Sequence, residues 1–240
     1  MAVTRSQPLS ALEQPANVPP YERDPRWGSD VIVDVLRALD IEYVALNPGA
    51  SYRGLHDSLV NYGGNRKPQM LLCHHEETAV HIAQAYYKAS GRLMGAIVHN
   101  VVGLQHATMA IFNAWCDRVP VLVLGGTGPM EAGLRRPWID WIHTANLQGN
   151  LVRDFVKWDD QPHGVGDIAE SLLRAYRTAL TMPGGPVYVC FDAEVQESPL
   201  AAAPPLPDVA RYRPAPPVPA PAEAIEQAAH LLVNAELPVA

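Results

Sequence analysis

Histidine and glutamate side chains gather in the segment HHEETAVHIAQAYYKASG, residues 74–91. Such residues can bind a metal ion, act as an acid and a base, or simply lie at the start of a helix. Zinc proteases carry the pattern HExxH, which places two histidines on one side of a helix facing one ion. Counted from His75, the second histidine is replaced by Ala79, and His81 lies on roughly the opposite helical face. The spacing therefore predicts no metal site in this segment.

Glu76 is the residue of this segment best placed for acid–base chemistry. It follows the apolar stretch QMLLC, a predicted strand, and precedes a predicted helix. Ligands of open α/β sheets bind beyond the carboxyl ends of the strands. Burial there can keep a carboxyl group protonated or make it a strong hydrogen-bond partner. Alternatively, Glu76 and Glu77 only complement the helix dipole, and position alone favours this second interpretation.

Two further predicted strands also end in polar residues beside a glycine. YVAL is followed by NPGAS, in which Gly49 lets the backbone approach a ligand closely. LMGAIV is followed by HNVVGLQHA, which supplies His99, Asn100 and His106. We expect these three strand ends to form one rim. Neither GxxxxGK[ST] nor GxGxxG occurs, so the rim is not a common phosphate loop.

The elements that would position these residues alternate along the chain. The predicted strands are 43–46, 69–73, 93–99, 119–125 and 186–192. The predicted helices are 51–60, 76–90, 104–116 and 167–181. Because the strands are continuously apolar, both faces of their sheet should be covered. The sequence therefore predicts an α/β fold, with a parallel β-sheet flanked by helices.

Composition divides the 240 residues into four parts. Residues 1–27 contain five prolines and are predicted to be a flexible arm. The α/β domain follows at 28–196, with Ser29 as the expected N-cap of its first helix. Nine prolines between 197 and 221 indicate a stiff Pro/Ala-rich linker. Residues 222–240 then predict one helix and the strand LPVA, the start of a second, incomplete α/β domain that the rest of a longer chain or another polypeptide would complete.

The overall composition limits the possible partners and compartment. A hydrophobic content of 48% is enough for a substantial core. A net charge of −7 and a pI near 5.7 argue against nucleic acid or an anionic membrane as the main partner. No apolar run is long enough to span a bilayer or resembles a signal peptide, which predicts a cytoplasmic protein. The cysteines form no CxxC pair and are predicted to be buried reduced thiols; they are Cys73, Cys116 and Cys190.

The motifs quoted so far, with AYYKASG, NAWCDRVPVLVLGG and GGPVYVCFD, occur in an order that resembles one known domain. It is the pyrimidine-binding (PYR) domain of thiamine-diphosphate enzymes of the acetolactate synthase and benzoylformate decarboxylase group. The resemblance runs from Trp27 to Asp192, and the helix from Ala222 is similar to the first helix of the family's central domain. It implies a lyase or transferase that cleaves or forms C–C bonds of a 2-oxo acid or related carbonyl compound.

The resemblance also implies roles for individual residues. Glu76 matches the family's HE glutamate, which hydrogen-bonds N1′ of the aminopyrimidine ring and promotes loss of the thiazolium C2 proton. Asn47 and Gly49 match the turn that approaches the pyrimidine. His99 matches a histidine that faces substrate and moves protons in benzoylformate decarboxylase-like members, although a purely structural hydrogen bond is the alternative. Asn100 is also expected to face the substrate.

Some positions depart from the family pattern. Val102 and His106 stand where members often have Pro and Asn, and Thr127 stands at a common Gln; all three are expected near the cofactor. These changes favour a pocket unlike that of a standard acetolactate synthase. His143 lies where some members place substrate-facing residues, but aromatic packing with Trp138 and Trp141 at an interface is the alternative.

The family's second half binds diphosphate and Mg²⁺ through GDG followed by Asn, and GDG is absent here. The chain is therefore expected to supply half of a thiamine diphosphate site, with Mg²⁺ held by a diphosphate-binding domain on a second chain or a missing C-terminal part. Self-association through the PYR domain is also implied, while flavin (FAD) binding is left open. The alternatives are a non-catalytic PYR-like scaffold or regulatory subunit, which need not keep Glu76, and an unrelated Rossmann-like nucleotide-binding domain.

Overall fold

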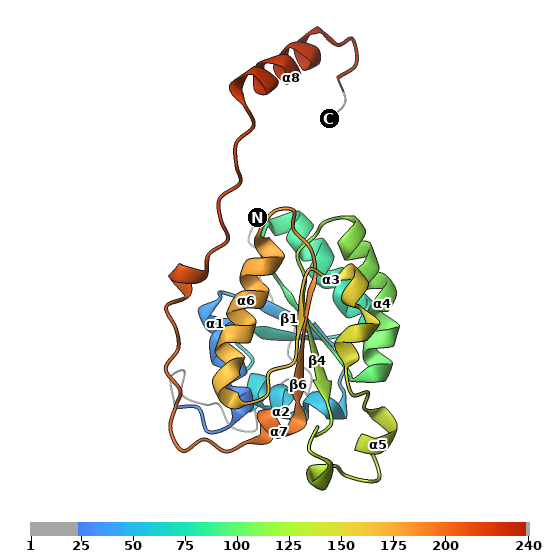
Figure 1. Ribbon diagram of the computed structural model, residues 1–240, viewed down its shortest axis with the longest axis vertical. Helices are drawn as coiled ribbons and strands as arrows, with labels where there is room; N and C mark the ends of the chain where they lie inside the picture. The colour runs from blue at the N-terminus through green and yellow to red at the C-terminus, as the bar shows by residue number, and fades with distance from the viewer. Residues whose placement is uncertain (1–23, 239–240) are drawn as a thin grey trace, which may run out of the picture.

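The computed structural model describes residues 24–238. Most of the predicted arm and the last two residues of the predicted strand LPVA lie outside the described residues. A six-stranded sheet has the order β2-β1-β3-β4-β6-β5, and every pair is parallel. The strands are β1 (Tyr43–Leu46), β2 (Gln69–Leu72), β3 (Gly95–Val98), β4 (Leu122–Thr127), β5 (Asp159–Asp160) and β6 (Val187–Asp192). The predicted α/β fold with a parallel sheet is confirmed (Figure 1).

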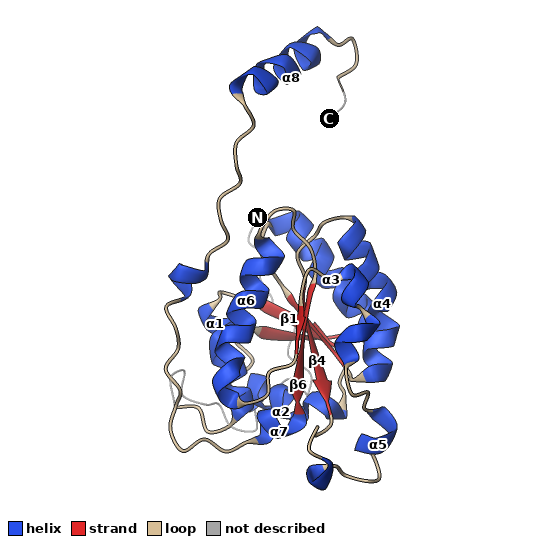
Figure 2. Cartoon of the chain, viewed as in Figure 1, coloured by secondary structure: helices blue, strands red, loops and turns tan. Residues whose placement is uncertain are grey.

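Long helices cover both faces of this sheet (Figure 2). On one side lie α1 (Gly28–Ala38) and α6 (Ile168–Leu180), and on the other α3 (Glu76–Ser90) and α4 (Val101–Cys116). The strands alternate between the two cores: Val44 and Leu46 face α1 and α6, whereas Ala45 faces α3 and α4. Because each face of the sheet contributes to a buried core, apolar residues follow one another along the strands.

The remaining elements are short, apart from the last helix. They are η1 (Ala50–Tyr52), α2 (Arg53–Asp57), η2 (Ser58–Tyr62), η3 (Ala132–Leu134), α5 (Asp140–His143), η4 (Gln148–Leu151), η5 (Arg153–Phe155), η6 (Val165–Asp167), α7 (Ala193–Glu197), η7 (Val209–Tyr212) and α8 (Ala222–Asn234). Helix α8 has no buried residue and stands apart from the sheet at the end of an extended segment (Figure 1). The predicted domain boundaries at 196 and 221 stay predictions. No helix of the described residues combines the length and apolarity needed to cross a membrane.

Four expectations about local structure are wrong. Ser29 is not the N-cap of α1, because the helix begins at Gly28 and the Asp30 carboxylate instead accepts the N–H groups of Arg26 and Trp27. Helix α4 starts three residues earlier than predicted, at Val101, where β-branched residues had obscured the helical pattern. Cys116 is exposed at the end of α4, although Cys73 and Cys190 are buried. Leu237 is 82% exposed and is not in a strand.

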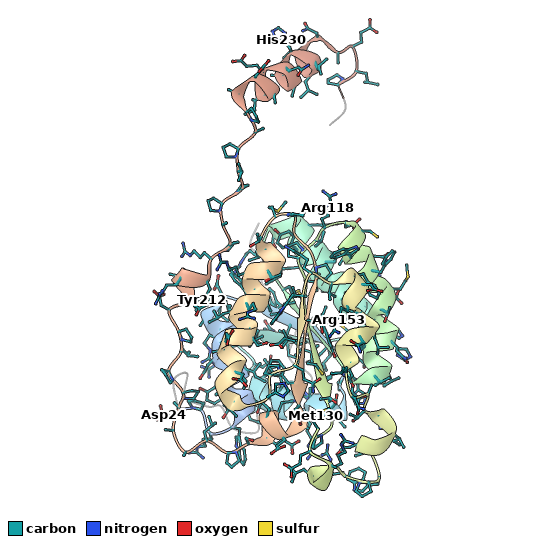
Figure 3. All side chains as sticks on the ribbon, viewed as in Figure 1. Asp24, Arg118, Met130, Arg153, Tyr212 and His230 are labelled. Carbon is teal, nitrogen blue, oxygen red and sulfur yellow. The ribbon has the colours of Figure 1, made fainter. Side chains whose placement is uncertain are left out.

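Because all strands run in one direction, their carboxyl ends meet at one edge of the sheet. In Figure 3, Met130 marks this edge, just beyond β4, and Arg118 marks the opposite edge. The loops after β2, β1 and β3 are therefore neighbours, as the three-part rim requires.

The buried Gln196 side chain fastens one of these loops to the sheet. Its Nε2 donates to the carbonyls of Ser51, at 3.0 Å, and Phe191, at 3.1 Å, while its Oε1 accepts the Leu55 N–H. The side chain is in α7, directly after β6, and is 1% exposed. One amide thus satisfies backbone groups of the β1 loop, α2 and β6.

We expect Gln196→Ala to lower the free energy of unfolding by about 2 to 4 kcal/mol, because buried backbone groups would lose their partners. Denaturant unfolding measures the change. The control is Gln227→Ala on the exposed helix α8, which should stay within about 0.5 kcal/mol of the parent. Equal effects of the two substitutions would contradict the fastening role of Gln196.

Candidate active site

Glu76 is the first residue of α3 and lies at the carboxyl end of β2. The helix begins there because His75 is extended, with φ −154°, and its Nδ1 accepts the N–H of Glu77. This start leaves the Glu76 side chain 5% exposed at the rim. Its Oε2 lies 3.4 Å from Nδ1 of His106, which comes from α4. The structure thus places a nearly buried carboxyl group beside an imidazole.

Two glycines pack directly against the side chains of Glu76 and His99. A Cβ atom at Gly103 would lie 2.8 Å from Cβ of His99 and 3.0 Å from Oε1 of Glu76. A Cβ atom at Gly49 would lie 2.7 Å from the His99 ring. The two contacts with His99 are too short for a real Cβ atom, so neither glycine can carry a side chain without movement of its neighbours. Gly49 and Gly103 therefore let the β1 loop and α4 approach the two polar side chains directly.

His99 follows β3 and is held from one side by the β1 loop. Its Nδ1 lies 2.8 Å from Oγ of Ser51. The His143 ring, at the end of α5, has its centroid 5.6 Å from that of His99. Burial and then the nearby His143 lower the pKa of His99, while Glu76 opposes them. A pKa below the ordinary value of about 6.5 makes His99 a neutral imidazole at pH 7.

His75, Glu76 and His106 form a compact group of metal-ligating types. The His75 and His106 rings stack with centroids 5.0 Å apart, and the three ligand atoms lie within 4.8 Å of one another. This group was missed in the sequence because its third member comes from α4, outside the segment 74–91. His81 is not part of it and instead lies 3.7 Å from Glu77. Two imidazoles and a carboxylate could also bind a divalent cation.

Two buried oxygens at the rim have no hydrogen-bond partner among the described residues. They are Oδ1 of Asn100, after β3, and Oγ1 of Thr127, at the end of β4. Buried polar atoms without partners are uncommon in folded proteins. Both atoms lie at the carboxyl edge of the sheet, where a ligand would find them, and both residues were site candidates in the sequence.

The other predicted residues differ in how closely they join this group. The Asn47 backbone carbonyl accepts a hydrogen bond from the Tyr52 hydroxyl, so that residue shapes the turn before Gly49. Val102 is 40% exposed in the first turn of α4. The site therefore consists chiefly of Glu76, Gly49, His99, Asn100, His106 and His143, with Thr127 at the end of the neighbouring strand.

Sequence reasoning missed Ser51, which is 5% exposed and contacts His99. The serine lies in the NPGAS turn, where Asn47 and Gly49 were the predicted site residues. The adjacency of β1 and β3 could have indicated it, because loops after neighbouring parallel strands meet. Gln148 was also missed; its Nε2 lies 3.1 Å from the Gly126 carbonyl and 3.2 Å from the Tyr188 hydroxyl.

Comparisons with a family model and with known proteins agree with one another. The family model described as "Thiamine pyrophosphate enzyme, N-terminal TPP binding domain" matches residues 26–145. The acetolactate synthase large subunit of Lactococcus lactis is 30% identical over 172 residues, covering 71% of this chain and 28% of that protein. The corresponding subunit of Corynebacterium glutamicum is 30% identical over 214 residues, covering 88% and 32%. This chain thus spans about a third or less of the length of these relatives.

A solved structure shows the same fold. The benzoylformate decarboxylase of Polynucleobacter necessarius superposes with a TM-score of 0.68 at 23% identity, covering 87% of this chain and 37% of that one. At that identity the likeness concerns the fold.

We expect His143→Ala to raise the pKa of His99, because it removes the nearby ring that disfavours the imidazolium form. A ring-proton NMR titration of the parent and of His143→Ala measures the shift, and His163→Ala, at an exposed site, is the control.

Since the folded pKa of His99 lies below its unfolded value, this residue's contribution to stability is present above about pH 6.5 and is lost as the pH falls toward the folded pKa. A His99 pKa of 6.5 or higher in the parent would contradict the argument.

Proposed function

This chain belongs to the thiamine pyrophosphate enzymes through their N-terminal TPP-binding domain, and from this premise we propose that it is the cofactor-activating half of such an enzyme. The substrate would be a 2-oxo acid or a related carbonyl compound, and the reaction C–C cleavage or carboligation. The observation that carries the proposal is the Glu76 side chain, which is 5% exposed at the carboxyl edge of a parallel sheet. A cytoplasmic location stays a prediction.

The residues at the rim suit the aminopyrimidine end of thiamine diphosphate. Glu76 would share a proton with the ring nitrogen, for which a nearly buried carboxyl group is suited. Gly49 and Gly103 leave backbone, without side chains, next to the polar groups. Asn100 and Thr127 offer buried oxygens that still lack partners. When bound, thiamine diphosphate supplies the nucleophilic carbon and the electron sink for the carbonyl chemistry.

His99 and His143 suit the substrate side of the same site. Their rings lie 5.6 Å apart between the β1 loop and α5. A neutral His99 can donate or accept a hydrogen bond without adding charge near Glu76. The contact between Ser51 and His99 is the structural hydrogen bond that the sequence left as an alternative; it orients the ring, so it is compatible with a role toward substrate.

The remaining cofactor groups would be held by other parts of the enzyme. The relatives are three to four times as long as the matched region, which supports a diphosphate-binding domain, with Mg²⁺, on a second chain or in further sequence. The exposed Met109, Phe112 and Trp115 on α4 suit self-association through this domain. A net charge of −7 argues against nucleic acid or an anionic membrane as a partner. FAD would be bound by the central domain if at all.

A non-catalytic scaffold is the second candidate for this chain. A scaffold would need the α4 surface but would not need a buried carboxyl group between His106 and Gly103. Burying an ionisable group costs free energy, and a scaffold would gain no catalytic function from it. The placement of Glu76 therefore favours the enzymatic half over the scaffold.

We expect Glu76→Gln in the complete assembly to slow exchange of the thiazolium C2 proton of thiamine diphosphate about 10²- to 10⁴-fold, because the amide cannot share an acidic proton with the ring. Proton–deuterium exchange followed by NMR measures the rate. The matched control is Glu77→Gln, one residue on, whose side chain is 43% exposed and lies beside His81. Exchange that is equally fast in both variants would remove the proposed function.

A further inference from the structure

The two nitrogens of the His99 ring have different environments. Nδ1 lies 2.8 Å from Oγ of the buried Ser51, whereas Nε2 has no partner among the described residues. The Ser51 hydroxyl also accepts the backbone N–H of Asn100, at 3.1 Å. Ser51 itself is fixed, because its carbonyl accepts from Gln196 and a Cβ atom at Gly126 would lie 2.5 Å from that carbonyl oxygen.

Counting donors and acceptors assigns the proton positions. Ser51 Oγ has two partners in the described part of the chain, and the one from Asn100 is a donor. If Nδ1 of His99 also donated, the buried serine hydroxyl would have no acceptor for its own proton, which is costly. The hydroxyl therefore donates to Nδ1, and neutral His99 carries its proton on Nε2.

His143 has the opposite arrangement. Its Nδ1 lies 2.9 Å from the backbone carbonyl of Ile139, one turn earlier. A carbonyl oxygen only accepts, so Nδ1 of neutral His143 carries the proton and its Nε2 is left with a lone pair. The two rings are 5.6 Å apart and inclined by 42°. One ring thus offers a donor at Nε2, and the other offers an acceptor.

We propose that Ser51 is a positioning residue that holds His99 in the Nε2–H tautomer, opposite a His143 held as Nδ1–H, so that the pair presents one donor and one acceptor to substrate. The donor suits a carbonyl oxygen, which a neutral imidazole can polarise by a hydrogen bond. The acceptor suits a hydroxyl group. This assignment rests on the proposed function for its substrate, but the tautomers themselves are a property of the chain alone.

The first test measures the tautomers by long-range proton–nitrogen correlation NMR of the chain at pH 7. We expect Nε2–H for His99 and Nδ1–H for His143. Ser51→Ala should leave His99 as a mixture of both tautomers. Ser58→Ala, at a serine that is 3% exposed and hydrogen-bonded to Asp30, should leave the His99 tautomer unchanged. An Nδ1–H tautomer of His99 in the parent, or no change in Ser51→Ala, overturns the proposal; if Ser51→Ala does not fold, the parent spectrum decides.

The second test uses the complete assembly with thiamine diphosphate. Ser51→Ala should lower kcat about tenfold, the value of one hydrogen bond, and leave the C2 proton exchange rate unchanged. If Ser51→Ala lowered both kcat and the C2 proton exchange rate, Ser51 would act on cofactor activation and its proposed role through His99 would be overturned. Normal exchange in Glu76→Gln would instead remove the proposed function, while the tautomer assignment would stand on the NMR result.

Discussion

The parallel pairing of β2, β1 and β3 is the constraint on which the site depends. Val44 pairs with Met70 on one side and with Gly95 on the other, which brings three strand ends to the same level. Glu76 follows the first strand, Ser51 the second and His99 the third. In an antiparallel sheet, alternate strand ends would lie at opposite edges, and these side chains could not meet. The strand register is set by the apolar residues that alternate between the two faces of the sheet. The hydrophobic core therefore positions these polar side chains.

Small residues on the α3 and α4 side of the sheet bring the polar groups together. Ala79 and Ala83 of α3 and Ala107 and Ala110 of α4 are all fully buried in that core. Without large side chains between them, the two helices pack closely, and Gly103 extends this contact to Glu76. The Glu76 carboxyl group is buried because the small residues of α4 allow that helix to cover it, while α4 also supplies His106.

Much of this arrangement could be predicted from local sequence, and the remainder depends on contacts across the fold. The strand 43–46 and the helix 76–90 coincide with the predicted ranges because hydrophobic runs and polar helix starts are local signals. The position of Glu76 at a strand end could therefore be inferred from the predicted strand 69–73 and the helix 76–90. The contact between Ser51 and His99 joins residues 48 apart and depends on side-chain rotamers in two loops. The exposure of Cys116 likewise depends on which side of α4 the neighbouring elements leave uncovered, and the sequence pattern does not reveal it.

The candidate site contains two groups of polar side chains that are separated by backbone. Glu76 and His106 form one group, and Ser51, His99 and His143 form the other; Gly103 lies between Glu76 and His99 and contributes no side chain. Coulombic interaction between Glu76 and His99 persists across this gap and opposes the lowering of the histidine pKa. The two groups are therefore coupled through charge and not through a shared hydrogen bond. Such coupling weakens with distance and solvent screening, so the nearly buried Glu76 carboxyl group reduces, without cancelling, the lowering of the His99 pKa.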